Sequence, residues 1–211
     1  SEAQIYFTIG VPAEESSILP RYKDINKNVK LVDLAEGVGE VYPHREFAPG
    51  DRDPHIWLSP KRVEVMIDII ADELSAIDPE NEEIYCKNAN EYKQQLKNLD
   101  ETIKKSMEAL ENKTIIVYHP AYGYFADDYG LTMLSLEEEG KEATIEDRIN
   151  LINIAKAQNI KVIFYQAEVD DKQALSFAEE IGGKAVLVEP LAADYINNLM
   201  KMANAFVSSL E

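Results

Sequence analysis

The sequence predicts an α/β fold whose parallel sheets are covered by helices, and three features of the chain support this. In residues 113–211, short apolar strands alternate with amphipathic helical segments, which is typical of a parallel sheet buried on both faces. Residues 3–10 have the pattern of a further buried strand that ends at a glycine. Between these parts, residues 79–112 repeat apolar side chains at steps of four and three, which indicates one long amphipathic helix.

The first part of the chain, residues 1–78, is expected to contain two strands. The strand at residues 3–10 is followed by a short helical segment from Val11 and by a second strand at residues 29–34. Residues 35–54 contain three glycines and three prolines, a composition that predicts a loop.

A helix is predicted to begin at Pro60. Ser59 is a favourable N-cap residue, and proline suits the first helical position that follows it. Apolar residues recur at helical spacing from Val63 to Ile77, which predicts one buried face. Pro79 is expected to end this helix and to start the next one.

The helix of residues 79–112 is expected to be the longest element of the chain. At about 1.5 Å per residue it would extend roughly 50 Å, which is longer than a small lobe is wide. It must therefore span two lobes or project from one. Its apolar stripe also fits a coiled coil, and the stripe alone does not decide between these arrangements.

The C-terminal part is predicted as a regular alternation of strands and helices. The strands are expected at residues 114–118, 132–136, 162–165 and 185–188, and the helices at residues 121–129, 144–158, 172–181 and from 194 onward. Ligands of such sheets bind beyond the carboxyl ends of the strands. His119, Gln166 and Glu189 each follow a strand directly, so we expect these side chains to face one crevice.

Three motifs along the chain resemble those of a known family. They are Asp53-Pro-His-Ile-Trp57, His119-Pro-Ala-Tyr-Gly-Tyr-Phe125, and Glu189-Pro-Leu191 followed by Asp194-Tyr-Ile196. The first two are specific in sequence and spacing, and the third is weaker. In this order they resemble the metal-ion solute-binding proteins of ABC uptake transporters, in the zinc and manganese branch, over essentially the whole chain.

The resemblance implies a two-lobed solute-binding protein whose parallel-sheet lobes are joined by a long, rigid helix. The domains would be residues 1–78, the remainder of an N-terminal lobe; residues 79–112, the connecting helix; and residues 113–211, the C-terminal α/β lobe. In the family, a strand, a helix and a loop with the first metal-binding histidine precede the strand of residues 3–10. The resemblance therefore implies a chain that lacks its N-terminal part and an N-terminal lobe that is incomplete.

The resemblance also implies capture of a divalent transition-metal ion outside the cytoplasmic membrane and its delivery to an ABC permease. The expected location is the periplasm or the outer face of the cytoplasmic membrane, with the full-length form tethered there. The metal ligands would be His55, His119 and Glu189. Two imidazoles and a carboxylate suit Zn²⁺, which is the expected ion, and Mn²⁺ is the alternative.

Other residues near the motifs are open to two interpretations. Position 166 is usually a glutamate in the family, so Gln166 argues against a charged partner there. His44 fits an exposed loop histidine, and the alternative is a substitute for the missing first ligand. The run Glu137–Gly140 fits a solvated loop, with a cation-attracting lip as the alternative, and Glu168 is expected to face solvent.

Composition narrows the classes of function. The formal net charge of −18 would repel a nucleic-acid backbone, and no basic cluster offsets it. No apolar run approaches the roughly 18 residues of a membrane span. The single cysteine, Cys86, excludes an internal disulfide and provides no thiol pair for metal or redox chemistry.

Two further functional possibilities follow from the number of ligands. Three ligands and an open position are also the pattern of a zinc-dependent hydrolase, but the chain has no His-Glu-x-x-His and no Gly-x-Ser-x-Gly motif. We therefore expect a binding protein and not an enzyme. A chain without its first ligand is expected to bind zinc weakly, and the alternative is that it binds no metal.

The open edge of an incomplete N-terminal sheet also predicts a homodimer.

Overall fold

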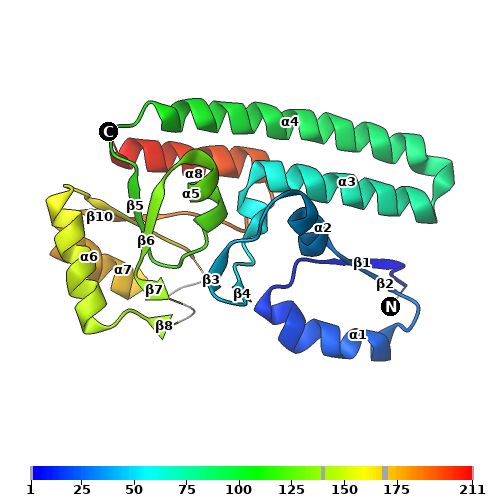
Figure 1. Ribbon diagram of the computed structural model, residues 1–211, viewed down its shortest axis with the longest axis horizontal. Helices are drawn as coiled ribbons and strands as arrows, with labels where there is room; N and C mark the ends of the chain where they lie inside the picture. The colour runs from blue at the N-terminus through cyan, green and yellow to red at the C-terminus, as the bar shows by residue number, and fades with distance from the viewer. Residues whose placement is uncertain (1, 139–140, 168–170, 211) are drawn as a thin grey trace. The chain divides into compact units, whose positions relative to one another are not determined.

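The computed structural model describes residues 2–138, 141–167 and 171–210 (Figure 1). The chain divides into two compact units, Ser1–Lys97 and Asn98–Glu211. The boundary falls inside helix α4 (Glu82–Glu108), so one continuous helix contributes residues to both units.

The first unit contains a parallel pair of strands, β1 (Ile5–Thr8) and β2 (Lys30–Asp33). Strand β1 is followed by a π-helical turn (Glu14–Ile18) and α1 (Leu19–Ile25). Strand β2 is followed by α2 (Leu34–Val41) and by the hairpin of β3 (Glu46–Ala48) and β4 (Asp51–Arg52). A 3-10 turn (Ile56–Leu58) then leads into α3 (Pro60–Ile77). Both predicted strands are confirmed.

Helix α2 shows that the predicted loop over residues 35–54 is wrong in its first third. Asp33 caps this helix, because its carboxylate accepts hydrogen bonds from two N–H groups of the first turn. Gly37 lies so close to α3 that an added Cβ would collide with the side chain of Ile69. The glycine therefore permits close packing of two helices and does not mark a turn.

The loop after β1 is held by the buried carboxylate of Glu14. This carboxylate accepts hydrogen bonds from the Thr8 hydroxyl at 2.6 Å and from the N–H of Gly10 at 2.8 Å. Burial by itself raises the pKa of the Glu14 carboxyl, but the hydrogen bonds from Thr8 and from the backbone of residues 9–11 hold this pKa below its ordinary value. Gly10 has a φ of +71°, a conformation that glycine adopts without strain.

Helices α3 and α4 run side by side in the first unit (Figure 1). Helix α3 begins at Pro60 as predicted, and Ser59 Oγ accepts the N–H of Arg62. Two ion pairs link the helices, Lys93 with Asp68 at 2.5 Å and Lys97 with Glu64 at 3.9 Å.

The long helix is confirmed, with shorter bounds than predicted. Residues Pro79–Asn81 form a separate 3-10 turn, so α4 covers 27 residues and extends about 40 Å. Its charged residues make α4 unsuitable as a membrane span, and none of the helices within the described ranges has the length and apolarity to cross a bilayer.

The second unit is built on a four-stranded parallel sheet in the order β10-β9-β5-β6. Its strands are β5 (Thr114–Val117), β6 (Thr132–Ser135), β9 (Val162–Tyr165) and β10 (Lys184–Leu187), and its helices are α5 (Gly123–Tyr129), α6 (Ile145–Ala157), α7 (Asp171–Glu180) and α8 (Tyr195–Leu210). A short hairpin of β7 (Glu137–Glu138) and β8 (Lys141–Glu142) follows β6. The predicted parallel α/β arrangement is confirmed, and element ends differ by one or two residues.

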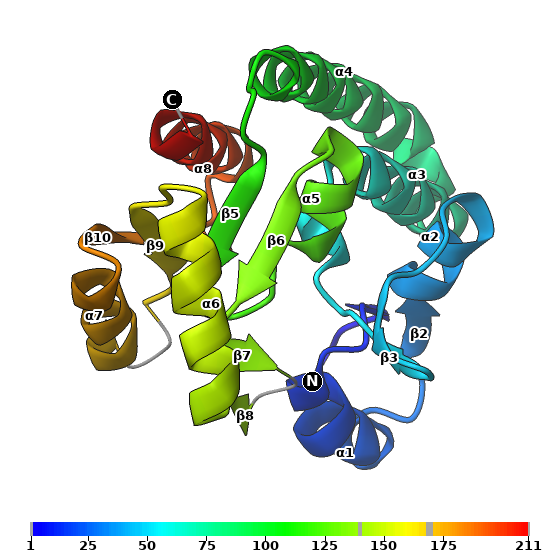
Figure 2. The same cartoon turned by 60° about the vertical axis from the view of Figure 1, so that its left-hand side comes forward.

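Helices cover both faces of this sheet (Figures 1 and 2). On one face, α6 and α7 pack on Ile116 and Ile163 and form a continuous apolar cluster. On the other face, α8 contributes Phe206, whose ring contacts those of Phe164 and Phe125 edge to face. Because both faces are buried, the carboxyl edge is where this sheet can present polar side chains to a ligand.

Candidate metal centre

His55 lies in the first unit, just before the 3-10 turn that leads into α3, and is paired with a buried carboxylate. Its Nδ1 lies 2.7 Å from Asp53 Oδ1, and the same oxygen accepts the backbone N–H of His55 at 2.9 Å. Asp53 is fully buried, and Arg45 Nε lies 3.6 Å from its second oxygen. The carboxylate favours the tautomer with the proton on Nδ1, so Nε2 carries the lone pair that a metal requires.

Two aromatic rings border the His55 imidazole. The centroid of Trp57 lies 5.1 Å away and that of Phe47 lies 6.3 Å away. With the two hydrogen bonds to Asp53, these rings fix the orientation of the imidazole, and its side chain remains 12% exposed.

His119 lies in the second unit and has the same kind of partner. It follows β5, and its Nδ1 lies 3.0 Å from Glu137 Oε2. The N–H of Glu137 donates to the carbonyl of Tyr118, which extends the pairing of β5 and β6 by two residues. The Glu137 side chain is only 14% exposed. The solvated-loop interpretation is therefore wrong for Glu137, because the sheet holds its carboxylate against the imidazole.

The pairing of Glu137 with His119 was not predicted from the sequence, although the sheet register contains the signal. Val117 of β5 lies opposite Ser135 of β6, so two residues further along each strand His119 lies opposite Glu137. The sequence shows that His119 lies opposite Glu137 only once β5 and β6 are known to be neighbouring strands. Glu139, Gly140 and Glu168 lie outside the described residues.

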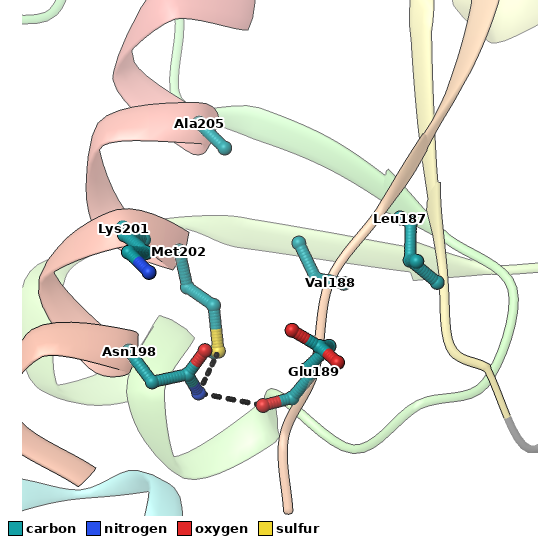
Figure 3. Close-up of a pocket in the computed structure, with 7 residues that line it drawn as sticks. All are labelled: Leu187, Val188, Glu189, Asn198, Lys201, Met202 and Ala205. Atoms are coloured by element: carbon teal, nitrogen blue, oxygen red, sulfur yellow. Dashed lines mark hydrogen bonds between the residues drawn. The ribbon is translucent and has the colours of Figure 1, made fainter. Parts of the chain in front are cut away.

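Glu189 is exposed and follows β10 by two residues. It lines a small pocket of about 130 Å³ against α8, together with Asn198, Lys201 and Met202 (Figure 3). Asn198 Nδ2 donates to the main-chain carbonyl of Glu189 at 2.6 Å, which fixes the backbone at this point. Within the described ranges, no group of three or more His, Cys, Asp or Glu side chains is arranged to hold a metal ion. The ligand set His55, His119 and Glu189 therefore stays a prediction.

His44 is exposed, in agreement with a loop histidine. Its ring lies against Gly39, where an added Cβ would collide with Nε2. Partial burial of the ring and the positive charge of Arg52, with a smaller effect of Arg62, lower the pKa of His44 below its ordinary value. The same positive charges oppose a bound metal cation. Cys86 is an exposed thiol on α4.

Comparison with known proteins gives relatives that match most of the chain. The high-affinity zinc uptake system protein ZnuA of Bacillus subtilis (strain 168) is 32% identical over 195 residues, which are 88% of this chain and 60% of that protein. The zinc-binding protein AdcA of Streptococcus pyogenes is 34% identical over 141 residues, which are 66% of this chain and 27% of that protein. The chain thus spans less than two thirds of the length of these relatives.

Solved structures share the fold. A crystal structure of ZnuA is 34% identical and superimposes with a TM-score of 0.93, covering 100% of this chain and 81% of that one. A zinc-bound deletion mutant of ZnuA gives a TM-score of 0.92 at the same identity. The periplasmic zinc-binding protein TroA of Treponema pallidum, at 17% identity and a TM-score of 0.86, shares the fold.

The family model described as zinc-uptake complex component A, periplasmic, matches residues 1–209. This match includes both histidine–carboxylate pairs and the strand ends that carry His119 and Glu189. The chain belongs to the ZnuA family of periplasmic zinc-uptake components.

Proposed function

We propose that this protein binds Zn²⁺ through His55, His119 and Glu189 and delivers it to the permease of an ABC transporter. The observation that carries the proposal is that both histidines have Nδ1 bonded to a carboxylate, Asp53 in one case and Glu137 in the other. Metal-binding histidines have this arrangement because it fixes the ring and makes Nε2 a stronger donor to the ion. The names of the ZnuA and AdcA relatives support zinc as the ion.

The chemistry of the proposed site is capture without a covalent step. Nitrogen ligands suit zinc and other late first-row metals better than Mg²⁺ or Ca²⁺, and Mn²⁺ is the alternative ion. Asp53 and Glu137 add negative charge behind the two imidazoles, which favours a bound cation. The hydrolase alternative finds no support, because the relatives named above are zinc-uptake and zinc-binding proteins.

The family also supports the rest of the assignment. We place the protein in the periplasm or at the outer face of the cytoplasmic membrane, where it is tethered, with an ABC permease as its partner. We also propose three functional parts: residues 1–78 as part of the N-terminal lobe, residues 79–112 as the connecting helix and residues 113–211 as the C-terminal lobe.

Isothermal titration with Zn²⁺ and Mn²⁺ tests the proposed metal function. We expect one zinc ion per chain and weaker binding of manganese, because two of the three proposed ligands are imidazoles. A protein that binds neither ion would contradict the proposal. If the natural protein has a further N-terminal histidine, as the resemblance predicts, it should bind zinc more tightly than residues 1–211. Equal affinities would contradict the prediction of a missing ligand.

We also propose that residues 1–211 form a homodimer through the first unit. In the described part of this unit, β1 and β2 make a sheet of two strands, and strand edges of such sheets pair readily with another chain. An apolar pocket of about 270 Å³ between α3 and α4, lined in part by Ile67, Leu74 and Tyr92, adds a surface that a second copy would cover. Light scattering should give the mass of a dimer, and a monomer over a wide concentration range would exclude it.

A further inference from the structure

The register of the second unit's sheet brings three polar side chains to one level at its carboxyl edge. Val117 of β5 lies opposite Ser135 of β6 and Phe164 of β9. Two residues further along each strand, these positions are His119, Glu137 and Gln166. The hydrogen bonds Glu137 N–H to Tyr118 O and Tyr118 N–H to Phe164 O show that the pairing continues beyond the strand ends.

Gln166 is thus the neighbour of His119 on the side away from Glu137. On its other side lies β10, where the N–H of Val188 donates to the carbonyl of Tyr165. Tyr165 lies opposite Leu187, so Val188 lies opposite Gln166 and Glu189 is the next residue. Gln166 therefore stands between the two proposed ligands of this unit. Adjacent strands lie about 4.8 Å apart, and Glu189 is one residue beyond the partner of Gln166, at the point where the chain has left β10.

The Gln166 side chain is buried at this edge of the sheet. The residue is 7% exposed, and Nε2 has no acceptor among the residues that the structure describes. A buried N–H group without an acceptor is destabilising, and native proteins keep few of them. Its place beside the proposed ligands indicates that its acceptor is supplied when the ion binds.

Among the groups around Gln166, the carboxylate of Glu189 is the suitable acceptor. The Nδ1 of His119 already has Glu137 as its partner, and imidazole Nε2 would bind the ion. A carboxylate that binds zinc through one oxygen keeps a second oxygen that accepts hydrogen bonds. In the structure Glu189 lines the pocket against α8, together with Asn198 (Figure 3). A hydrogen-bond donor on the neighbouring strand would favour a conformation of Glu189 in which its carboxylate points toward the ion.

We propose that Gln166 is a positioning residue for the carboxylate ligand: when Glu189 binds Zn²⁺ through one oxygen, Gln166 Nε2–H donates a hydrogen bond to the other. This inference rests on the proposed zinc-binding function. The amide orients Glu189 without adding charge.

The first test is the substitution Gln166→Met, which keeps the length of the side chain and removes the amide. Zinc affinity, measured by competition with a fluorescent chelator, should fall about 10-fold, as for other groups that orient metal ligands. The midpoint of thermal unfolding in excess chelator should stay the same or rise, because the unsatisfied donor is gone. Gln158→Met, at an exposed position of the same unit, is the control and should change neither quantity.

These two measurements separate a positioning role from a structural one. A structural role for the amide predicts a lower unfolding midpoint in chelator and an unchanged zinc affinity, and this result would overturn the inference. Gln166→Leu provides a second variant without the amide, should Gln166→Met not fold. It should also weaken zinc binding, because a leucine side chain cannot donate to Glu189.

A double-mutant cycle tests the assigned partner. In a Glu189→Ala background, Gln166→Met should cause no further loss of zinc affinity. A further 10-fold loss would show that the amide acts through another group and would overturn the inference. If the unsubstituted protein binds zinc and Gln166→Met binds it equally well, only this inference fails. If the unsubstituted protein does not bind zinc, the proposed function fails and the inference fails with it.

Discussion

Replacing His119 by alanine is expected to lower the affinity for zinc by about 100-fold or more. Loss of a group that merely orients a ligand costs about 10- to 100-fold in affinity, and loss of a ligand should cost at least as much. The substitution removes the imidazole whose Nδ1 lies 3.0 Å from Glu137 Oε2, and it leaves the Glu137 carboxylate without this partner. Titration with zinc in competition with a chelator of known affinity measures the change.

His44→Ala is the matched control for this experiment. His44 is a histidine of the first unit that lies near Arg52 and Arg62, whose positive charges oppose a metal ion. We expect its replacement to leave zinc affinity unchanged. If His44→Ala weakened binding as strongly as His119→Ala, His44 would be a ligand, and the proposed set of three would be wrong.

Replacing Asp53 by alanine is expected to lower both stability and zinc affinity. The substitution removes the carboxylate that contacts both Arg45 and His55 and leaves the backbone N–H of His55 without this acceptor. We expect the free energy of unfolding to fall by about 1.5 to 3 kcal/mol, the range for hydrogen bonds to charged groups. The zinc affinity should fall about 10- to 100-fold, because the His55 ring loses the group that orients it.

Urea unfolding in the presence of a chelator measures the stability of this variant, and zinc titration measures its affinity. Asp51→Ala is the control, since Asp51 is an exposed carboxylate two residues away in β4. It should change neither value. An Asp53→Ala variant that loses stability and keeps its zinc affinity would show that Asp53 is structural only and that His55 does not depend on it for metal binding.

Much of the fold could be predicted from local sequence patterns. The Ser59-Pro60 pair identifies the start of α3, because capping depends on residues that are adjacent in the chain. The alternation of strands and helices after residue 113 predicts the parallel sheet for the same reason. Helix α2 was missed because its glycines have the composition of a loop. In the structure Gly37 lies in close contact with the side chain of Ile69 on α3, a contact between helices that local composition does not reveal.

The family resemblance, the α/β class and the histidines to be tested could all be predicted from the sequence, because these are encoded in short motifs and in periodic patterns. Three features emerge only from the tertiary structure: Asp53 pairs with His55, Glu137 pairs with His119, and the Gln166 amide nitrogen is buried without an acceptor among the described residues. Glu137 and Gln166 are distant from His119 in the chain. They meet it because β6 and β9 both pair with β5 in a register that aligns their ends. Strand order and register depend on packing across the whole sheet, so no local pattern could reveal these neighbours.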